Sequence, residues 1–320
     1  KVKERAAALA TQTDRPKDAK GIALARLKRS VDDSGIHYEH VDVAIDAAAR
    51  TITITVNAPA AGEAVELDEI LGRGAQWWPL AMARELDDAI LHLRTNVREA
   101  GIWIMKTRGE SAAILRLDQA LDAHREHWFV RETIGFVRRT FARLDVSSRS
   151  IYAVIDQGSC FAGTLFELAL AADRSYMLVA EDDAPSVVLS AMNFGPYTMP
   201  NELTRLATRF GAEVDIERGK AFDAQQALDL GLVTFAPDEL DWDDELRLAI
   251  EERASLSPDA LTGMEASLRF GGRETIATKI FGRLSAWQNW IFIRPNAVGE
   301  QGALKLFGSG SKPRFTWERI

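Results

Sequence analysis

Residues 153–173 read AVIDQGSCFAGTLFELALAAD, and this stretch decides the fold. A predicted strand over residues 151–155 runs into Gly158 and Gly163, and a predicted apolar helix follows over about 164–172. Backbone N–H groups at the start of a helix favour an oxyanion or a phosphate. The stretch therefore predicts a strand-to-helix turn. On the residues alone, this is either a tight turn without a ligand or a turn that also binds an anion.

Glu167 is the one charged residue inside this predicted helix, where its neighbours are Leu165, Phe166, Leu168 and Ala169. Apolar surroundings would desolvate the carboxylate and raise its pKa, as a general acid or base requires. A glutamate in the first turn of a helix is also common as a surface residue that interacts with the helix dipole. Both interpretations stay open on the residues alone.

The flanking sequence alternates strands and helices. Residues 41–46 and 52–56 alternate apolar and polar side chains and predict a β-hairpin that ends at Asn57-Ala58-Pro59. Further strands are predicted at 102–105 and 176–179, further helices at 81–98 and 121–144, and residues 200–320 have an almost wholly helical pattern. Strands and helices joined by short loops predict an α/β fold.

Three regions are expected along the chain. The first residue is Lys1, inside an amphipathic helical pattern, and residues 13–21 hold proline, glycine and charged side chains typical of a linker. We therefore expect residues 1–34 to be the end of a preceding element plus a linker. Residues 35–255 form the expected core, and residues 256–320 an expected helical extension with a tail.

Composition excludes several classes of protein. The 320 residues include 39 Lys and Arg and 47 Asp and Glu, so the net charge is −8, the wrong sign for a nucleic-acid-binding protein. Cys160 is the only cysteine, which rules out an intrachain disulfide and a multi-thiolate zinc site and indicates a reducing cytoplasm. No apolar run approaches the roughly 20 residues of a membrane span. We expect a cytoplasmic protein with no membrane or nucleic-acid partner.

The other motifs favour structural roles. His124 and His127 are three residues apart with no third ligand implied, so a solvated helix face is preferred over a metal site. Cys160 lacks a partnered histidine, which favours a small buried filler over a nucleophile. Two aromatic clusters, one at Trp77 and Trp78 and one at Trp287 and Trp290, predict core or subunit contacts rather than a ligand platform.

The order of these elements resembles the crotonase (enoyl-CoA hydratase/isomerase) superfamily over roughly residues 38–270. Four motifs carry the resemblance: ITITVNAP at 52–59, AVIDQGSCFAGTLFELALAAD at 153–173, KAFDAQQALDLGLV at 220–233 and LSPDAL at 256–261. The resemblance implies a crotonase-like ββα superhelix, an acyl-CoA thioester as substrate, and no metal or separate cofactor.

The resemblance also implies site residues. Glu167 matches a family glutamate, and the oxyanion donor three residues before it becomes the backbone N–H of Thr164, beside Gly163. The first oxyanion loop corresponds to residues 106–118, KTRGESAAILRLD, where the family's A-G-A-D tetrad is absent. Ala191 stands at the position of the second family glutamate. A single carboxylate cannot perform two-carboxylate acid-base chemistry, so a degenerate copy retained as a scaffold is expected.

A closer resemblance is to large crotonase relatives with two crotonase-like halves in one chain. Residues 14–24, 189–206 and 287–310 resemble parts of them, and the resemblance covers essentially the whole chain. It implies ring-opening of an epoxide or dihydrodiol of benzoyl-CoA to an unsaturated adipyl-CoA semialdehyde and formate. On this hypothesis the chain is the C-terminal half, which packs on an upstream half and contributes a homodimer surface.

Two alternatives stay open. One is a self-sufficient enoyl-CoA hydratase or isomerase that uses Glu167 with a replacement group such as Ser190 or Asn193. The other is a non-catalytic interaction module.

Overall fold

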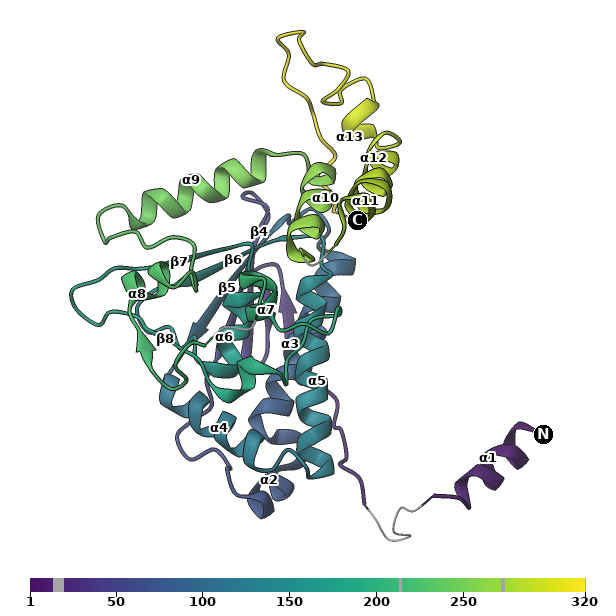
Figure 1. Cartoon of the computed structure of the whole chain (residues 1–320), viewed down its shortest axis with the longest axis vertical. Coiled ribbons are helices and arrows are strands. Elements are labelled where there is room, and N and C mark those ends of the chain that lie inside the picture. The colour runs from purple at the N-terminus through teal and green to yellow at the C-terminus, as the bar shows by residue number, and fades with distance from the viewer. Residues whose placement is uncertain (14–19, 213–214, 272–273, 320) are drawn as a thin grey trace.

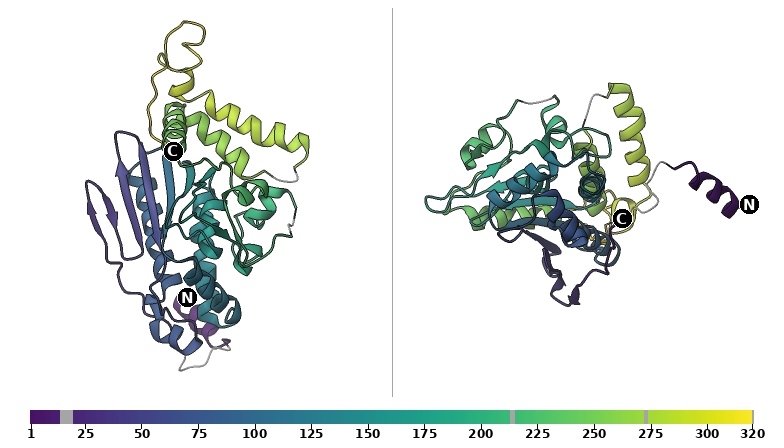
Figure 2. Two further views of the ribbon diagram at one scale, coloured as in Figure 1. Left: turned by 90° about the vertical axis from the view of Figure 1, so that its left-hand side faces the viewer. Right: turned by 90° about the horizontal axis from the view of Figure 1, so that it is seen from below.

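A seven-stranded sheet organises the computed structural model, which describes residues 1–13, 20–212, 215–271 and 274–319. Its strands lie in sequence order, antiparallel from β1 to β4 and parallel from β4 to β7. Figure 2 shows the antiparallel strands at one side of the molecule. The bounds are β1 Ser30–Asp32, β2 Gly35–His37, β3 Val41–Asp46, β4 Thr51–Asn57, β5 Ile102–Arg108, β6 Ser150–Ile155 and β7 Arg174–Met177.

The hairpin predicted at residues 41–56 is confirmed as β3 and β4. Val43 pairs with Ile54, and the two side chains are buried in the main core. Arg50 turns the hairpin with a positive φ of 55°. Alternating burial along β3 follows the alternating apolar and polar residues of the sequence, because successive side chains in a strand point to opposite faces.

Helices cover both faces of the parallel half of the sheet (Figure 1). On one face, α3 (Trp78–Asn96) packs against α5 (Trp128–Asp145), and α4 (Ser111–Ala123) packs against α6 (Gly163–Leu170). On the other face, Tyr152 of β6 and Tyr176 of β7 pack against α9 (Trp242–Ser255). This layered arrangement confirms the predicted α/β class.

The single helix predicted over 121–144 is wrong, because α4 ends at Ala123 and α5 begins at Trp128. The side chain of His127 accepts a hydrogen bond from the Phe129 N–H at 3.3 Å and caps the second helix. His124 and His127 therefore lie in a turn. The described residues contain no group of three or more histidine, cysteine or acidic side chains that could hold a metal ion.

The region after residue 200 is less helical than its pattern predicts. Its helices are α7 Arg205–Phe210, α8 Ala224–Asp229, α9, α10 Pro258–Arg269, α11 Ile276–Thr278, a π-helical turn Lys279–Leu284, α12 Ser285–Ile291 and α13 Pro295–Val298. A short strand β9 (Ala221–Phe222) pairs with β8 (Val187–Val188), and residues 299–319 form turns, bends and chain without regular secondary structure. The helices α10 to α13 gather at one end of the molecule (Figure 2).

The N-terminal helix α1 (Val2–Ala10) has no buried residue and is drawn away from the body in Figure 1. Most of the linker predicted at residues 13–21 lies outside the described residues. No helix among the described residues has the length and apolar character that crossing a membrane requires.

Candidate functional site

The turn singled out by the sequence leads from β6 into α6, and all eight residues of α6 are buried. Gly163 begins the helix with a φ of +44°, a conformation that L side chains rarely adopt. A Cβ at this position would lie 1.8 Å from Asp118 Oδ2 and 2.8 Å from Ser190 Oγ. Close approach of Asp118 and Ser190 therefore requires a glycine at position 163.

Asp118 occupies the place where the sequence predicted an oxyanion. The Thr164 N–H, the expected oxyanion donor, donates to Asp118 Oδ2 at 2.8 Å. Ser190 Oγ donates to the same oxygen at 2.6 Å, and the Thr164 hydroxyl donates to Asp118 Oδ1. The Tyr197 hydroxyl lies 3.1 Å from Thr164 Oγ1. We call these four residues the Asp118 cluster.

Burial dominates the electrostatics of the Asp118 cluster. The side chains of Asp118 and Thr164 are 2% and 1% exposed. Removal from water raises the pKa of Asp118 to about 6, although hydrogen bonds from Ser190 and Thr164 oppose the rise. In either protonation state the carboxyl group of Asp118 accepts the Thr164 N–H, so this N–H is not available to a thioester oxygen.

Glu167 lies one turn further along α6, and both of its carboxylate oxygens are bound. Asn193 Nδ2 donates to Oε1 at 2.7 Å, and Arg205 Nη1 donates to Oε2 at 2.7 Å. Arg205 also donates through Nε and Nη2 to the two oxygens of Asp145, at 3.2 and 2.7 Å. We call Glu167, Asn193, Arg205 and Asp145 the Glu167 cluster.

The Glu167 cluster combines two carboxylates with one guanidinium in the protein interior. The side chains of Arg205, Asp145 and Glu167 are nearly completely buried. Burial raises the pKa of Glu167, while attraction to Arg205 and the bond from Asn193 act in the opposite direction. A buried carboxylate with both oxygens bound is arranged to stabilise structure, since accepting a substrate proton would break an ion pair.

The two clusters meet at the 3-10 turn η2 (Ala191–Phe194). Ala191, at the position of the second family glutamate, begins this turn, and the flanking Ser190 and Asn193 form a capping box. The structure brings both proposed replacement groups to the site, Asn193 onto Glu167 and Ser190 onto Asp118. Each is engaged with a carboxylate.

The helix α4 takes the place of the first oxyanion loop. Strand β5 ends at Arg108, and α4 begins at Ser111 after only Gly109 and Glu110. Beyond its first turn, the backbone N–H groups of α4 are used by the helix itself. The segment 106–118 therefore supplies a carboxylate, Asp118, to the site, a role that the sequence expectation for this segment did not include.

Cys160 has the structural environment that the sequence favoured. Its side chain is completely buried, and burial raises the pKa of the thiol to about 11. The Cys160 N–H donates to Thr107 Oγ1 at 2.9 Å. Trp77 and Trp78 are likewise buried in the core, and their indole N–H groups donate to the carbonyls of Ala64 and Asn57.

No protein-family model matches the chain. A benzoyl-CoA-dihydrodiol lyase from Aromatoleum evansii is 59% identical to it over 325 residues, a match that includes 100% of this chain and 59% of the lyase. The chain is a homologue of one part of that lyase. It thus spans less than two thirds of the length of the curated relative that it matches.

Solved structures agree on the fold. An enoyl-CoA hydratase from Bacillus anthracis superposes with a TM-score of 0.60 at 20% identity and covers 88% of this chain and 100% of its own. An enoyl-CoA hydratase from Mycobacterium smegmatis gives a TM-score of 0.59 at 14% identity, with 86% and 98% covered. The chain has the crotonase fold. The fold expectation from the sequence is therefore confirmed, whereas the roles of Glu167, Gly163 and Thr164 stay predictions.

Proposed function

We propose that this lyase homologue is the scaffold half of a cytoplasmic enzyme that opens the ring of 2,3-epoxy- or dihydrodiol-benzoyl-CoA. The products would be 3,4-didehydroadipyl-CoA semialdehyde and formate, and the reaction would use no metal or redox cofactor. The identity of 59% to a benzoyl-CoA-dihydrodiol lyase supports the assignment to this reaction. In this proposal the acid-base chemistry takes place in another part of the enzyme.

One observation carries the scaffold role: the Thr164 N–H is bonded to the Asp118 carboxylate at 2.8 Å. Catalysis on a thioester needs donors that are free to bind the developing oxyanion. A carboxylate at that place would repel an oxyanion as well as fill its position. Glu167 is buried and holds Asn193 on one carboxylate oxygen and Arg205 on the other, so a substrate proton would have to compete with an ion pair.

Calorimetric titration of the chain with benzoyl-CoA tests this proposal. We expect no heat of binding at the Asp118 cluster from folded protein at 100 μM, a concentration that detects micromolar affinity. Binding in the micromolar range that an Asp118→Glu substitution abolishes would overturn the proposal. This substitution keeps the charge and adds a methylene to a closed site, and circular dichroism would confirm that the variant is folded.

A self-sufficient hydratase or isomerase is the second candidate, and the pKa of Glu167, which burial raises, favours it. If Glu167 transfers protons, a Glu167→Gln variant should lose at least a hundredfold in hydration of an enoyl-CoA, the usual contribution of a positioned acid or base. Equal rates for the two proteins would remove Glu167 as acid or base. No activity in either protein would agree with the scaffold role.

The C-terminal helices are the surface that we propose for assembly with an upstream half or a second copy. Phe281 and Ile293 are 80% and 75% exposed, and a mostly apolar groove of about 420 Å³ separates α10 from α12. Trp287 and Met264 line this groove. Contiguous exposed apolar surface is typical of protein–protein contacts.

Sedimentation of a Phe281→Ser, Ile293→Ser double variant tests the assembly role. We expect a dimer in the unsubstituted protein and a monomer in the variant. Leu240→Ser is the matched control, because Leu240 is 89% exposed and lies outside these helices. An unchanged mass in the double variant, or an equal loss in the control, would contradict the assembly role.

A further inference from the structure

A cavity lies beside the Glu167 cluster and meets it only at Asp145, whose carboxylate is paired with Arg205. It has a volume of about 650 Å³, is partly open to solvent, and is lined by α3, the end of α5 with the loop after it, α10, Trp287 of α12 and Arg319. Neither Thr164 nor Glu167 lines it. Arg149, in the loop that leads into β6, does, and it is 2% exposed.

Positive charge exceeds negative charge around this cavity. Most of the charged lining groups are paired: Arg319 with Glu265, Arg269 with Asp173 and Arg143 with Asp87. Arg149 and Arg94 have no carboxylate partner among the described residues. The cavity therefore holds two guanidinium groups whose charge is not balanced by an ion pair.

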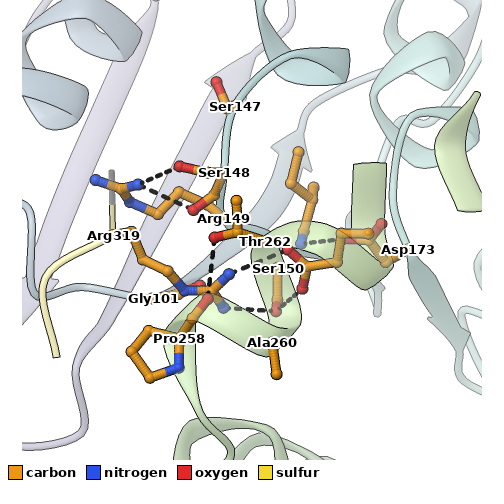
Figure 3. Close-up of polar contacts among 12 residues, drawn as sticks. Gly101, Ser147, Ser148, Arg149, Ser150, Asp173, Pro258, Ala260, Thr262 and Arg319 are labelled. Carbon is orange, nitrogen blue, oxygen red and sulfur yellow. Dashed lines mark hydrogen bonds and ion pairs between the residues drawn. The ribbon is translucent and has the colours of Figure 1, made fainter. Parts of the chain in front are cut away.

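The hydrogen bonds of Arg149 leave one edge of its guanidinium empty. Nη1 donates to the carbonyl oxygen and the hydroxyl of Ser148, at 2.9 and 3.2 Å. Figure 3 shows that the contacts drawn from this guanidinium all run to Ser148. Nε and Nη2 are buried and have no hydrogen-bond partner. Buried donors without an acceptor are unfavourable, so this edge is unsatisfied in the isolated chain.

Two neighbouring arginines show what the same edge binds in this protein. Arg269 directs Nε and Nη2 at the oxygens of Asp173, at 2.8 and 2.6 Å, and Arg205 directs the same two atoms at Asp145. This edge matches two oxygens on one centre, as in a carboxylate or a phosphoryl group. We propose that the Arg149 cavity is a binding site for such an oxyanion, with the Nε and Nη2 edge of Arg149 as its anchor.

The surroundings of Arg149 favour an anion over a neutral ligand. Burial, together with repulsion from Arg319 and Arg94, lowers the pKa of Arg149 to about 10. An anion on the free edge would relieve both effects, because it would supply the missing acceptors and oppose the positive charge. The Nε and Nη2 edge of Arg149 is buried, and Arg149 lines the cavity. An anion would therefore reach this edge from the cavity, after a side chain that lines the cavity moves aside.

Binding of inorganic phosphate and of acetate tests the proposal, with sodium chloride at matched ionic strength as the reference. We expect at least one of the two oxyanions to raise the melting temperature of the chain above the chloride value and to give saturable heat in calorimetry. The comparison between phosphate and acetate distinguishes a phosphoryl from a carboxylate ligand. Equal melting temperatures in phosphate, acetate and chloride would overturn the proposal.

Variants locate the binding. Arg149→Gln should weaken the affinity at least tenfold without loss of stability, because it removes an unbalanced buried charge. Arg94→Gln, at a half-exposed position on the same cavity, should weaken it several-fold. Arg116→Gln, on the exposed face of α4, is the control and should bind as the unsubstituted chain does. Unchanged affinity in both cavity variants would place the anion elsewhere and refute the assignment. Coenzyme A displaced by phosphate would identify its phosphates as one source of the ligand.

Discussion

We expect the Asp118→Asn substitution to stabilise the protein at neutral pH and to leave its stability nearly unchanged at pH 4. Asparagine keeps the shape of aspartate and can keep its partners. Its carbonyl oxygen can accept from the Thr164 N–H and Ser190 Oγ, while its amide donates to Thr164 Oγ1, whose hydroxyl then turns to Tyr197. Only the charge is lost.

The magnitude follows from the shift in the pKa of Asp118, from 3.8 in the unfolded chain to about 6 in the fold. Between these values the folded protein binds more protons than the unfolded chain, so the free energy of unfolding decreases as the pH rises from about 4 to about 6. A shift of roughly two units corresponds to about 3 kcal/mol at 1.36 kcal/mol per unit. The asparagine variant does not show this decrease in the free energy of unfolding. Above pH 6.5 its free energy of unfolding should therefore exceed that of the native protein by up to about 3 kcal/mol.

Urea denaturation of both proteins at intervals from pH 4 to pH 8 measures this difference. Titration of every other group is common to the two proteins, so their difference isolates Asp118. Asp122→Asn, at an exposed position on the same helix, is the control and should show no such pH dependence. A stability difference that stays flat from pH 4 to pH 8, or a variant that is less stable at pH 7, would refute the assignment of a desolvated carboxylate.

Three further substitutions and one reactivity measurement test the buried residues of the site and its surroundings. Arg205→Leu should lower the free energy of unfolding by about 3–5 kcal/mol, because it leaves two buried carboxylates unpaired. Glu167→Gln should lower it by less, since Arg205 keeps its ion pair with Asp145. If chemical denaturation gave the reverse order, the ion-pair description would be contradicted. Gly163→Ala should lower the free energy of unfolding by about 2–5 kcal/mol, because φ is positive at this position and the new methyl group would lie 1.8 Å from Asp118 Oδ2. A calorimetric melting temperature within a degree of the native value would count against this geometry. Cys160 should react with a thiol reagent at pH 8 far more slowly in the folded protein than in the urea-denatured protein, because burial raises its pKa to about 11. Equal rates in the two states would show that the thiol is accessible.

The fold could be predicted because its signals are local. The alternation of residues 41–56 and the strand-to-helix turn before Glu167 each depend on a few neighbouring side chains, and both elements are confirmed. The break between α4 and α5 was missed because it depends on one side-chain cap at His127 within a continuous helical pattern. The excess of helix predicted after residue 200 has the same origin, since turn residues there also fit a helical period.

The site was only partly predictable, because its partners come from distant parts of the chain. Asp118 lies 46 residues from Thr164, and Arg205 lies 38 residues from Glu167. A signal for Asp118 was present: it follows Ile114 by four residues and precedes Leu121 by three, which places an acidic side chain on the buried face of its helix. No comparable local pattern marks the pairing of Arg205 with Glu167, which depends on the packing of α7 against α6.

The last described residues are attached to the body by contacts that do not depend on the exposed turns before them. Thr316 exchanges two hydrogen bonds with Asn296, and Arg319 reaches Glu265 and the carbonyl of Arg98. Gly308 to Lys312, by contrast, are exposed. A protease that cuts this stretch would therefore produce a nicked protein whose short C-terminal peptide stays bound until the fold is denatured.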